Sequence, residues 1–255
     1  MTTTPSLNTP SISTASAEEV AKFARLADTW WDPAGAFRPL HKFNPERIRY
    51  IRDRLARHFN RDVRSDAPFA GLRLLDIGCG GGLIAEPMAR LGFEVTGIDA
   101  AEDNINTARI HAIRSELAIT YETATPESAF DYKPFDAVLA LEVVEHVSDV
   151  AAFVDATARL VKPGGVCILA TLNRTAKGLL LGKIAAEYLL RWVPPGTHDW
   201  RKFVRPSELA SAVRRSGMTV VELAGLSFDI ATDSWRISRD LDVNYVMMAV
   251  KSRAA

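Results

Sequence analysis

The chain has 255 residues, of which 47% are hydrophobic, and its 31 lysines and arginines balance its 31 aspartates and glutamates. This length is enough for one substantial core, and the balanced charge argues against nucleic acid as a partner. Only two cysteines occur, Cys79 and Cys167, which argues against a disulfide framework or a cysteine-based zinc site.

The N-terminus of the chain, residues 1–16, is rich in Ser, Thr and Pro and has no charged side chain, so we expect a disordered tail there. It contains no apolar core of a signal peptide, and no arginine precedes Arg25, which argues against a mitochondrial leader. No stretch of the chain is apolar for long enough to span a bilayer. We expect a cytoplasmic protein with one domain over residues 17–255.

Helices are expected before the first strand over 17–26 and over 45–59, where Pro45 stands in the first turn. The aromatic, proline-containing segment between them, 30–43, is expected to be an ordered loop. From residue 72 onward, apolar runs with the length of buried strands alternate with helical patterns. The expected strands are 72–77, 94–98, 118–121, 135–141, 165–172, 218–223 and 244–250, and the expected helices are 83–91, 103–116, 149–161 and 206–216.

This alternation predicts an α/β fold, with a doubly wound and mostly parallel seven-stranded sheet of Rossmann type. An insertion over 173–205 separates the fifth strand from the last helix, and we expect it to form a lid. Ligands of such sheets bind at the carboxyl ends of the strands, so the residues that follow each strand are the candidates for a site.

The first expected strand has Asp76 next to its last residue, and a glycine cluster that begins at Gly78 and includes Gly80 follows it. Without a Cβ, glycines let backbone N–H groups approach a ligand closely. Asp99 ends the second strand, at the distance along the chain where a carboxylate accepts hydrogen bonds from both hydroxyls of a ribose. These features predict a nucleoside site.

The glycine cluster does not match the patterns of two other nucleotide-binding folds. A dinucleotide fingerprint requires glycine at the position of Leu83, and a phosphate-binding P-loop requires a Gly-Lys-Ser/Thr that is missing here. An NAD-dependent oxidoreductase is therefore the less favoured alternative, suggested by fold class alone.

The run 76–82, together with Asp99, resembles the first two motifs of the seven-stranded methyltransferases that use S-adenosylmethionine. Further segments resemble the ubiquinone-biosynthesis O-methyltransferases in particular, and the similarity extends from about residue 18 to residue 250. These segments are Trp30–Pro33 with Pro39–His41, Asn44–Ile51, Leu141–Val147, Thr171–Arg174, Gly196–Asp199 and Val243–Tyr245.

The resemblance implies which residues contact S-adenosylmethionine. The Arg47 guanidinium suits the methionine carboxylate, because it can bind a carboxylate through two parallel hydrogen bonds. Many methyltransferases place a carboxylate after the third strand to meet the adenine, but this chain has Ala124 and Thr125 there, so we expect backbone groups to bind the adenine. The expected cofactor-binding residues are Arg47, Asp76, Gly78, Gly80, Asp99 and Leu141.

The cluster of Glu142, Glu145 and His146 follows the fourth strand, and in a helix its spacing would put all three side chains on one face. The resemblance implies a magnesium-type cation at these positions, although the histidine also suits zinc. His146 as a general base and a salt-bridged structural turn remain alternatives. We expect the three residues to activate the methyl acceptor; His41 and His198 are either auxiliary groups or hydrogen-bonded structural histidines.

The acceptor implied by the resemblance is a phenolic hydroxyl of polyprenyl catechol intermediates in ubiquinone biosynthesis, with both O-methylation steps served by one enzyme. A helix over 178–193, with Leu181, Leu189 and Trp192 on its apolar side, is a candidate for peripheral contact with the inner membrane, or for an ordinary lid helix. A complex of ubiquinone-biosynthesis proteins is a further expected partner, and nucleic acid is not. The alternatives are a methyltransferase with a soluble acceptor and a non-catalytic scaffold that binds S-adenosylmethionine.

Overall fold

The computed structural model describes residues 14, 29–35, 37–179, 200–229 and 231–253. The helix expected over 17–26 and most of the 173–205 insertion lie outside these residues. Thr14, within the expected N-terminal tail, is buried: its hydroxyl donates a hydrogen bond to Glu127, and its carbonyl accepts one from the N–H of Ser148. Thr14 thus has defined polar contacts, while the rest of the expected tail lies outside the described residues.

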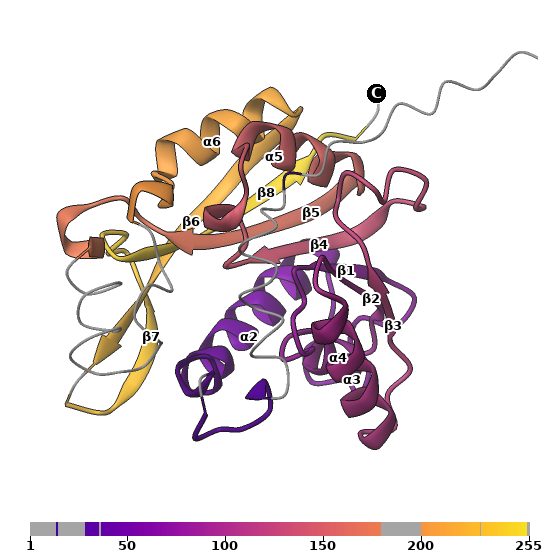
Figure 1. The fold of residues 1–255 in the computed structure, drawn as a ribbon. Coiled ribbons are helices and arrows are strands. Elements are labelled where there is room, and N and C mark those ends of the chain that lie inside the picture. The colour runs from indigo at the N-terminus through magenta and orange to yellow at the C-terminus, as the bar shows by residue number, and fades with distance from the viewer. Residues whose placement is uncertain (1–13, 15–28, 36, 180–199, 230, 254–255) are drawn as a thin grey trace, which may run out of the picture.

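An eight-stranded sheet with the order β3-β2-β1-β4-β5-β8-β6-β7 forms the centre of the molecule (Figure 1). The strands β3, β2, β1, β4 and β5 are parallel, whereas β8 runs antiparallel to both β5 and β6. This confirms the doubly wound, mostly parallel sheet. The strands are β1 (Arg73–Ile77), β2 (Glu94–Asp99), β3 (Thr120–Thr123), β4 (Phe135–Leu141), β5 (Val161–Leu172), β6 (Met218–Asp229), β7 (Ser234–Ser238) and β8 (Asn244–Lys251).

The sheet has one strand more than the seven expected from the sequence, and the additional strand is β7. β6 continues to Asp229, six residues beyond its expected end at Leu223, and β7 pairs with this extension in a hairpin. β7 has five residues, is mostly half-buried or exposed, and has no continuous apolar run. Its pairing with β6 is what makes it a strand, and a pattern of buried residues could not reveal it.

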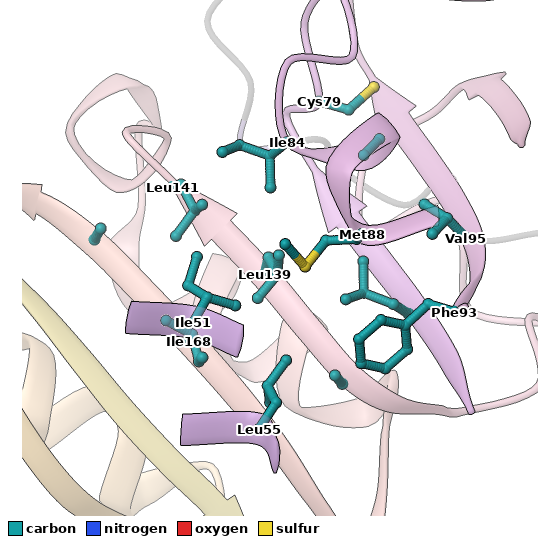
Figure 2. Close-up of a cluster of buried hydrophobic side chains, with 14 of the residues drawn as sticks. Ile51, Leu55, Cys79, Ile84, Met88, Phe93, Val95, Leu139, Leu141 and Ile168 are labelled. Atoms are coloured by element: carbon teal, nitrogen blue, oxygen red, sulfur yellow. The ribbon is translucent and has the colours of Figure 1, made fainter. Parts of the chain in front are cut away.

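Helices cover both faces of the sheet, and each face has its own hydrophobic cluster. Figure 1 shows α5 and α6 on one side, and α2, α3 and α4 on the other. Figure 2 shows Ile51 and Leu55 of α2 and Met88 of α3 gathered at Leu139 of β4. The helices are α2 (Arg38–Phe59), α3 (Ala85–Arg90), α4 (Glu102–Arg114), α5 (Val150–Arg159) and α6 (Pro206–Arg215), with short 3-10 turns η2 (Val144–His146) and η4 (Trp200–Lys202).

Helix α2 begins seven residues before its expected start at Pro45. Pro39 occupies its first turn, and Pro45 lies inside the helix, where it removes a backbone hydrogen bond at a cost of about 3 kcal/mol or more. The helix nevertheless continues through Pro45, because Phe43 on one side of it and Tyr50 on the other both pack into the core. The loop expected over 30–43 therefore ends at Phe37.

Candidate functional site

The glycine cluster forms a tight turn between β1 and α3, at the carboxyl ends of β1 and β2. The N–H groups of Gly78 and Cys79 both donate to the carbonyl of Ile98, at 2.8 and 3.0 Å, and so attach the turn to β2. Gly78 has φ +68°, and a Cβ there would lie 2.4 Å from the side chain of Val143. Both the backbone conformation and the space thus require glycine at this position.

Asp99, at the end of β2, lies against the glycine turn as the sequence predicted. One carboxylate oxygen accepts a hydrogen bond from the N–H of Gly80 (3.0 Å). The other accepts from the N–H of Ala101 (2.8 Å) and from the side-chain amide of Asn104 (3.2 Å). Burial raises the pKa of Asp99, and these three donors oppose that rise by stabilising the ionised carboxylate.

Arg47 reaches the carboxyl ends of the strands from α2 and is almost completely buried. Its Nη1 lies 3.2 Å from Oε1 of Glu142, and its Nη2 donates to Asn44 at 2.7 Å, but its Nε has no partner. Burial lowers the pKa of Arg47, while Glu142 and Asp76 act in the opposite direction. A buried guanidinium with an unused N–H is able to bind a further anionic group.

Asp76, in β1, is also buried, and its Oδ2 has no hydrogen-bond partner. Burial raises the pKa of Asp76 to about 7, against the opposing effect of Arg47. A buried carboxylate with a free oxygen costs free energy unless a donor or a cation reaches it. Asp76 therefore suits a cationic group of a ligand.

Residues 142–146 do not form one continuous helical turn, which was the condition for all three side chains to share a face. Only Val144–His146 adopt a 3-10 turn, and Glu142 precedes it with a left-handed backbone of φ +57°. The N–H of Glu142 donates to Ala170 in β5, which continues the sheet pairing past the end of β4. Glu142, Glu145 and His146 therefore do not lie on one helical face.

The two glutamates have different partners. Glu145 is buried, and its Oε2 accepts a hydrogen bond from the hydroxyl of Thr171 at 2.6 Å, while its Oε1 has no partner. Burial and the nearby Glu145 raise the pKa of Glu142, although Arg47 opposes the rise. Over the described part of the chain, no three His, Cys, Asp or Glu side chains are grouped so that they could hold a metal ion. As arranged, this donor set does not fit the expected three-ligand cation site.

The remaining predicted residues border the same region. Leu141 is buried at the end of β4, near Ile84 of the glycine turn (Figure 2). Nε2 of His41 lies 2.9 Å from the carbonyl oxygen of Trp30, a contact of the kind that a hydrogen-bonded structural histidine makes. After β3, the Oγ1 of Thr125 is buried without a partner. His198 lies outside the described residues.

Sequence reasoning missed Trp30, Asn104 and Tyr121 as parts of this site. The ring of Trp30 lies over the glycine turn, where a Cβ at Gly80 would come within 2.4 Å of it. The hydroxyl of Tyr121 lies beneath the same turn, 2.4 Å from the position of a Cβ at Gly82. The repeated tryptophan at 30–31 was the one available signal, but it carries no information about where the ring lies.

The site as a whole contains more carboxyl groups than cationic groups. Four carboxylates, those of Asp76, Asp99, Glu142 and Glu145, end at the same edge of the sheet as the single guanidinium of Arg47. A ligand with both a cationic centre and a carboxylate would complement this arrangement.

Comparison with known proteins gives a consistent family assignment. Residues 41–223 match the family model described as a methyltransferase domain. The chain is 54% identical over 241 residues to the ubiquinone biosynthesis O-methyltransferase of Paramagnetospirillum magneticum. The aligned region covers 94% of this chain and 96% of that protein. It is 52% identical to the protein of the same name from Chelativorans sp., again with 94% and 96% coverage.

Among solved structures, the fold is similar to that of magnesium protoporphyrin IX methyltransferase from Synechocystis PCC 6803. The structure of that protein with bound SAH has a TM-score of 0.61 and 18% identity, with coverage of 91% of this chain and 94% of that one. At this level of identity, the likeness concerns the fold alone.

Proposed function

This chain belongs to the ubiquinone biosynthesis O-methyltransferases that use S-adenosylmethionine, and from that premise we propose how it moves the methyl group to a phenolic oxygen of a polyprenyl catechol. The observation that supports the proposal best is the pair of incompletely bonded, buried groups Arg47 and Asp76. S-adenosylmethionine carries a carboxylate and an ammonium on the same carbon. We assign the carboxylate to Arg47 and the ammonium to Asp76.

The remaining cofactor contacts are proposed from the residues in and beside the glycine turn. Asp99 would accept hydrogen bonds from the ribose hydroxyls, the backbone at Gly78 and Gly80 would contact the ligand, and Leu141 would pack against it. The negative charge at this edge of the sheet favours the cationic sulfonium of the donor over its neutral product.

The reaction is an in-line displacement at the methyl carbon. The bond from carbon to sulfur breaks as the bond from carbon to the phenolic oxygen forms, and S-adenosylhomocysteine leaves. The protein chiefly aligns the two reactants, because sulfonium is already a good leaving group. A free phenol has a pKa of about 10, so it needs a group that takes its proton.

We assign that proton to the carboxylate of Glu142. Its raised pKa makes the ionised carboxylate a stronger base than an exposed glutamate. Arg47 holds it at one oxygen, and Glu145, fixed by Thr171, adds negative charge nearby. His146 stays a candidate for the same role.

A divalent cation at Glu142, Glu145 and His146 is the second candidate for acceptor activation. When bound, it would lower the pKa of the phenol and hold two neighbouring oxygens. This would require Glu142 to exchange its contact with Arg47 for the metal.

Methyl transfer to a polyprenyl catechol, measured with labelled S-adenosylmethionine, tests both roles. We expect Glu142→Gln to lower kcat by roughly 10²- to 10⁴-fold, the usual contribution of a general base. Glu94→Gln, at an exposed glutamate of β2, is the matched control and should retain full activity. Full activity of Glu142→Gln would contradict the assignment.

A chelator distinguishes the two candidates. Activity that persists in EDTA supports proton transfer to Glu142, whereas a loss that added Mg²⁺ reverses supports the cation. Transfer to a tail-less catechol with equal efficiency would favour a soluble acceptor instead, and binding of the donor without any transfer would favour a scaffold.

The polyprenyl tail of the proposed acceptor requires access to a bilayer. No described helix is long and apolar enough to cross a membrane. We propose that residues 178–193, most of which lie outside the described part, make peripheral contact with the membrane surface. In liposome flotation, the chain should partition less when residues 178–193 are removed, and equal partitioning would contradict the proposal. Service of both O-methylation steps and association with other ubiquinone-biosynthesis proteins belong to the same proposal.

A further inference from the structure

Trp30 belongs to the N-terminal segment, residues 29–35, and its ring lies against the glycine turn. It is 8% exposed, and its ring stacks on Phe37 with a centroid separation of 3.7 Å and an interplanar angle of 6°. A Cβ at Gly80 or at Gly81 would come within 2.5 Å of it. The glycines of this turn therefore accommodate an indole ring of the protein itself, in addition to any ligand.

A hydrogen-bond chain runs from Trp30 to Asp99. The indole Nε1 of Trp30 donates to Oδ1 of Asn104 at 2.9 Å, and Nδ2 of Asn104 donates to Oδ1 of Asp99 at 3.2 Å. Asn104 lies in the first turn of α4 and is 2% exposed. These hydrogen bonds thus connect Trp30 to the end of β2 and the first turn of α4, which lie about 70 residues further along the sequence.

The chemistry of the indole fixes the orientation of the Asn104 amide. An indole N–H is a donor only, so the atom of Asn104 that faces it must be the oxygen. The NH₂ group must then face Asp99, where it acts as a donor to the carboxylate. The indole and the carboxylate therefore select the same orientation of the amide, and without Trp30 the Oδ1 atom of Asn104 would lose the donor that holds it in place.

Trp31 attaches the same segment at a second point. Its indole Nε1 donates to the carbonyl of Gly81 at 2.8 Å, and its ring stacks on His111 at a centroid separation of 3.5 Å. His111 in turn lies 2.6 Å from the buried carboxylate of Glu86. The segment that carries Trp30 is therefore held on both the glycine turn and α4, which keeps the indole in register with Asn104.

We propose that Asn104, oriented by the indole of Trp30, is a positioning residue that aims the Asp99 carboxylate at the ribose of the methyl donor. Neither residue needs to touch the reacting atoms: Asn104 acts through Asp99, and Trp30 acts through Asn104. This inference rests on the proposed function only in taking Asp99 as the ribose-binding group. It adds that the N-terminal segment determines how tightly the donor is held.

The test is the affinity for S-adenosylhomocysteine, measured by calorimetry on the full chain. We expect Asn104→Ala to weaken binding about tenfold, the effect of one hydrogen bond to a charged group. Trp30→Phe keeps the stacked ring and removes only the N–H, and it should weaken binding by a similar factor. Asn106→Ala, at an exposed asparagine of the same helix, is the matched control and should bind like the parent chain.

The background of Asp99→Asn shows whether Asn104 acts through the carboxylate. In that background we expect Asn104→Ala to cause no further loss of affinity, and kcat at saturating donor should stay within about threefold of the parent of each pair. Unchanged binding by both Asn104→Ala and Trp30→Phe would overturn the inference, as would an equal loss from Asn104→Ala with and without Asp99. Calorimetry needs no acceptor, so the result is independent of whether a polyprenyl catechol is the substrate.

Discussion

Asp76 should make the free energy of unfolding of the protein depend on pH. Burial raises its pKa to about 7, compared with about 3.9 in an unfolded chain. Between these values the folded protein keeps a proton that the unfolded chain has released, so the contribution of Asp76 to stability falls as pH rises through this window and is lost above it. The slope from one such group is at most about 1.4 kcal/mol per pH unit.

Asp76→Asn should remove this slope. Urea unfolding of the cofactor-free protein at pH 5, 6, 7 and 8 should show the variant gaining stability relative to the parent as pH rises towards 7. Asp155→Asn, at an exposed aspartate of α5, is the control. Parallel pH profiles for Asp76→Asn and the parent would show that Asp76 is not protonated in the folded state.

At Arg47, binding of the methyl donor should depend on the planar shape of the guanidinium as well as on its positive charge. Arg47→Lys keeps the positive charge but loses the planar fork that bonds Asn44 and Glu142 together. We expect the KM for S-adenosylmethionine to rise about tenfold, equivalent to ~1.4 kcal/mol. Arg49→Lys, at a more exposed arginine of the same helix, should leave the KM unchanged. A normal KM in Arg47→Lys would argue against a carboxylate on this guanidinium.

At the scale of elements, the glycine turn and the segment that carries Trp30 depend on each other. Gly80→Ala places a side chain at φ +51° and 2.4 Å from the Trp30 ring. Gly71 has φ +80° with nothing within 4 Å, so Gly71→Ala measures the backbone cost alone, about 1–2 kcal/mol. We expect Gly80→Ala to cost roughly 1–3 kcal/mol more than Gly71→Ala in urea unfolding, because it also overpacks the indole.

A double-mutant cycle separates the two contributions. In the Trp30→Ala background, the contact with the ring is gone, so Gly80→Ala should cost no more than Gly71→Ala. If Gly80→Ala costs the same with and without the indole, the turn and the N-terminal segment are independent elements.

At the scale of the whole molecule, the site should couple to global stability. A ligand that binds only the folded chain stabilises it by about 2.7 kcal/mol at a hundred times its Kd. For a domain of this size, that corresponds to a rise in Tm of roughly 5–10 °C. S-adenosylhomocysteine should produce this shift and NAD should not. A rise in Tm with NAD alone would instead support the NAD-dependent oxidoreductase, the alternative that Leu83 argues against.

Much of this molecule could be predicted from local patterns. The parallel strands, the glycine turn and the placement of Asp99 beside it were all expected, because each depends on residues adjacent in the chain. The proximity of Arg47 to Asp76 was not derivable from spacing, since it depends on how α2 packs on the sheet. The family resemblance, not the pattern, pointed to Arg47.

The errors have a common cause. The shared face considered for Glu142, Glu145 and His146 required a helical backbone, but a backbone hydrogen bond from Glu142 to β5 continues the sheet pairing, and Glu142 has a left-handed conformation. Pro45 suggested a helix start, but core contacts on both sides of it extend the helix to Arg38. In both cases, contacts with distant residues outweighed a local preference.

The primary structure alone thus specified the class of fold, the glycine turn between the first strand and its helix and, through resemblance, the family. Those features arise from backbone chemistry and hydrophobic order over short stretches of chain. Packing decided the rest: the indole of Trp30 meets Asn104 across 74 residues, and Arg47 meets Glu142 across 95. Such contacts form only when the helices pack on the sheet. Local sequence patterns cannot predict them, because the residues are so far apart in the chain.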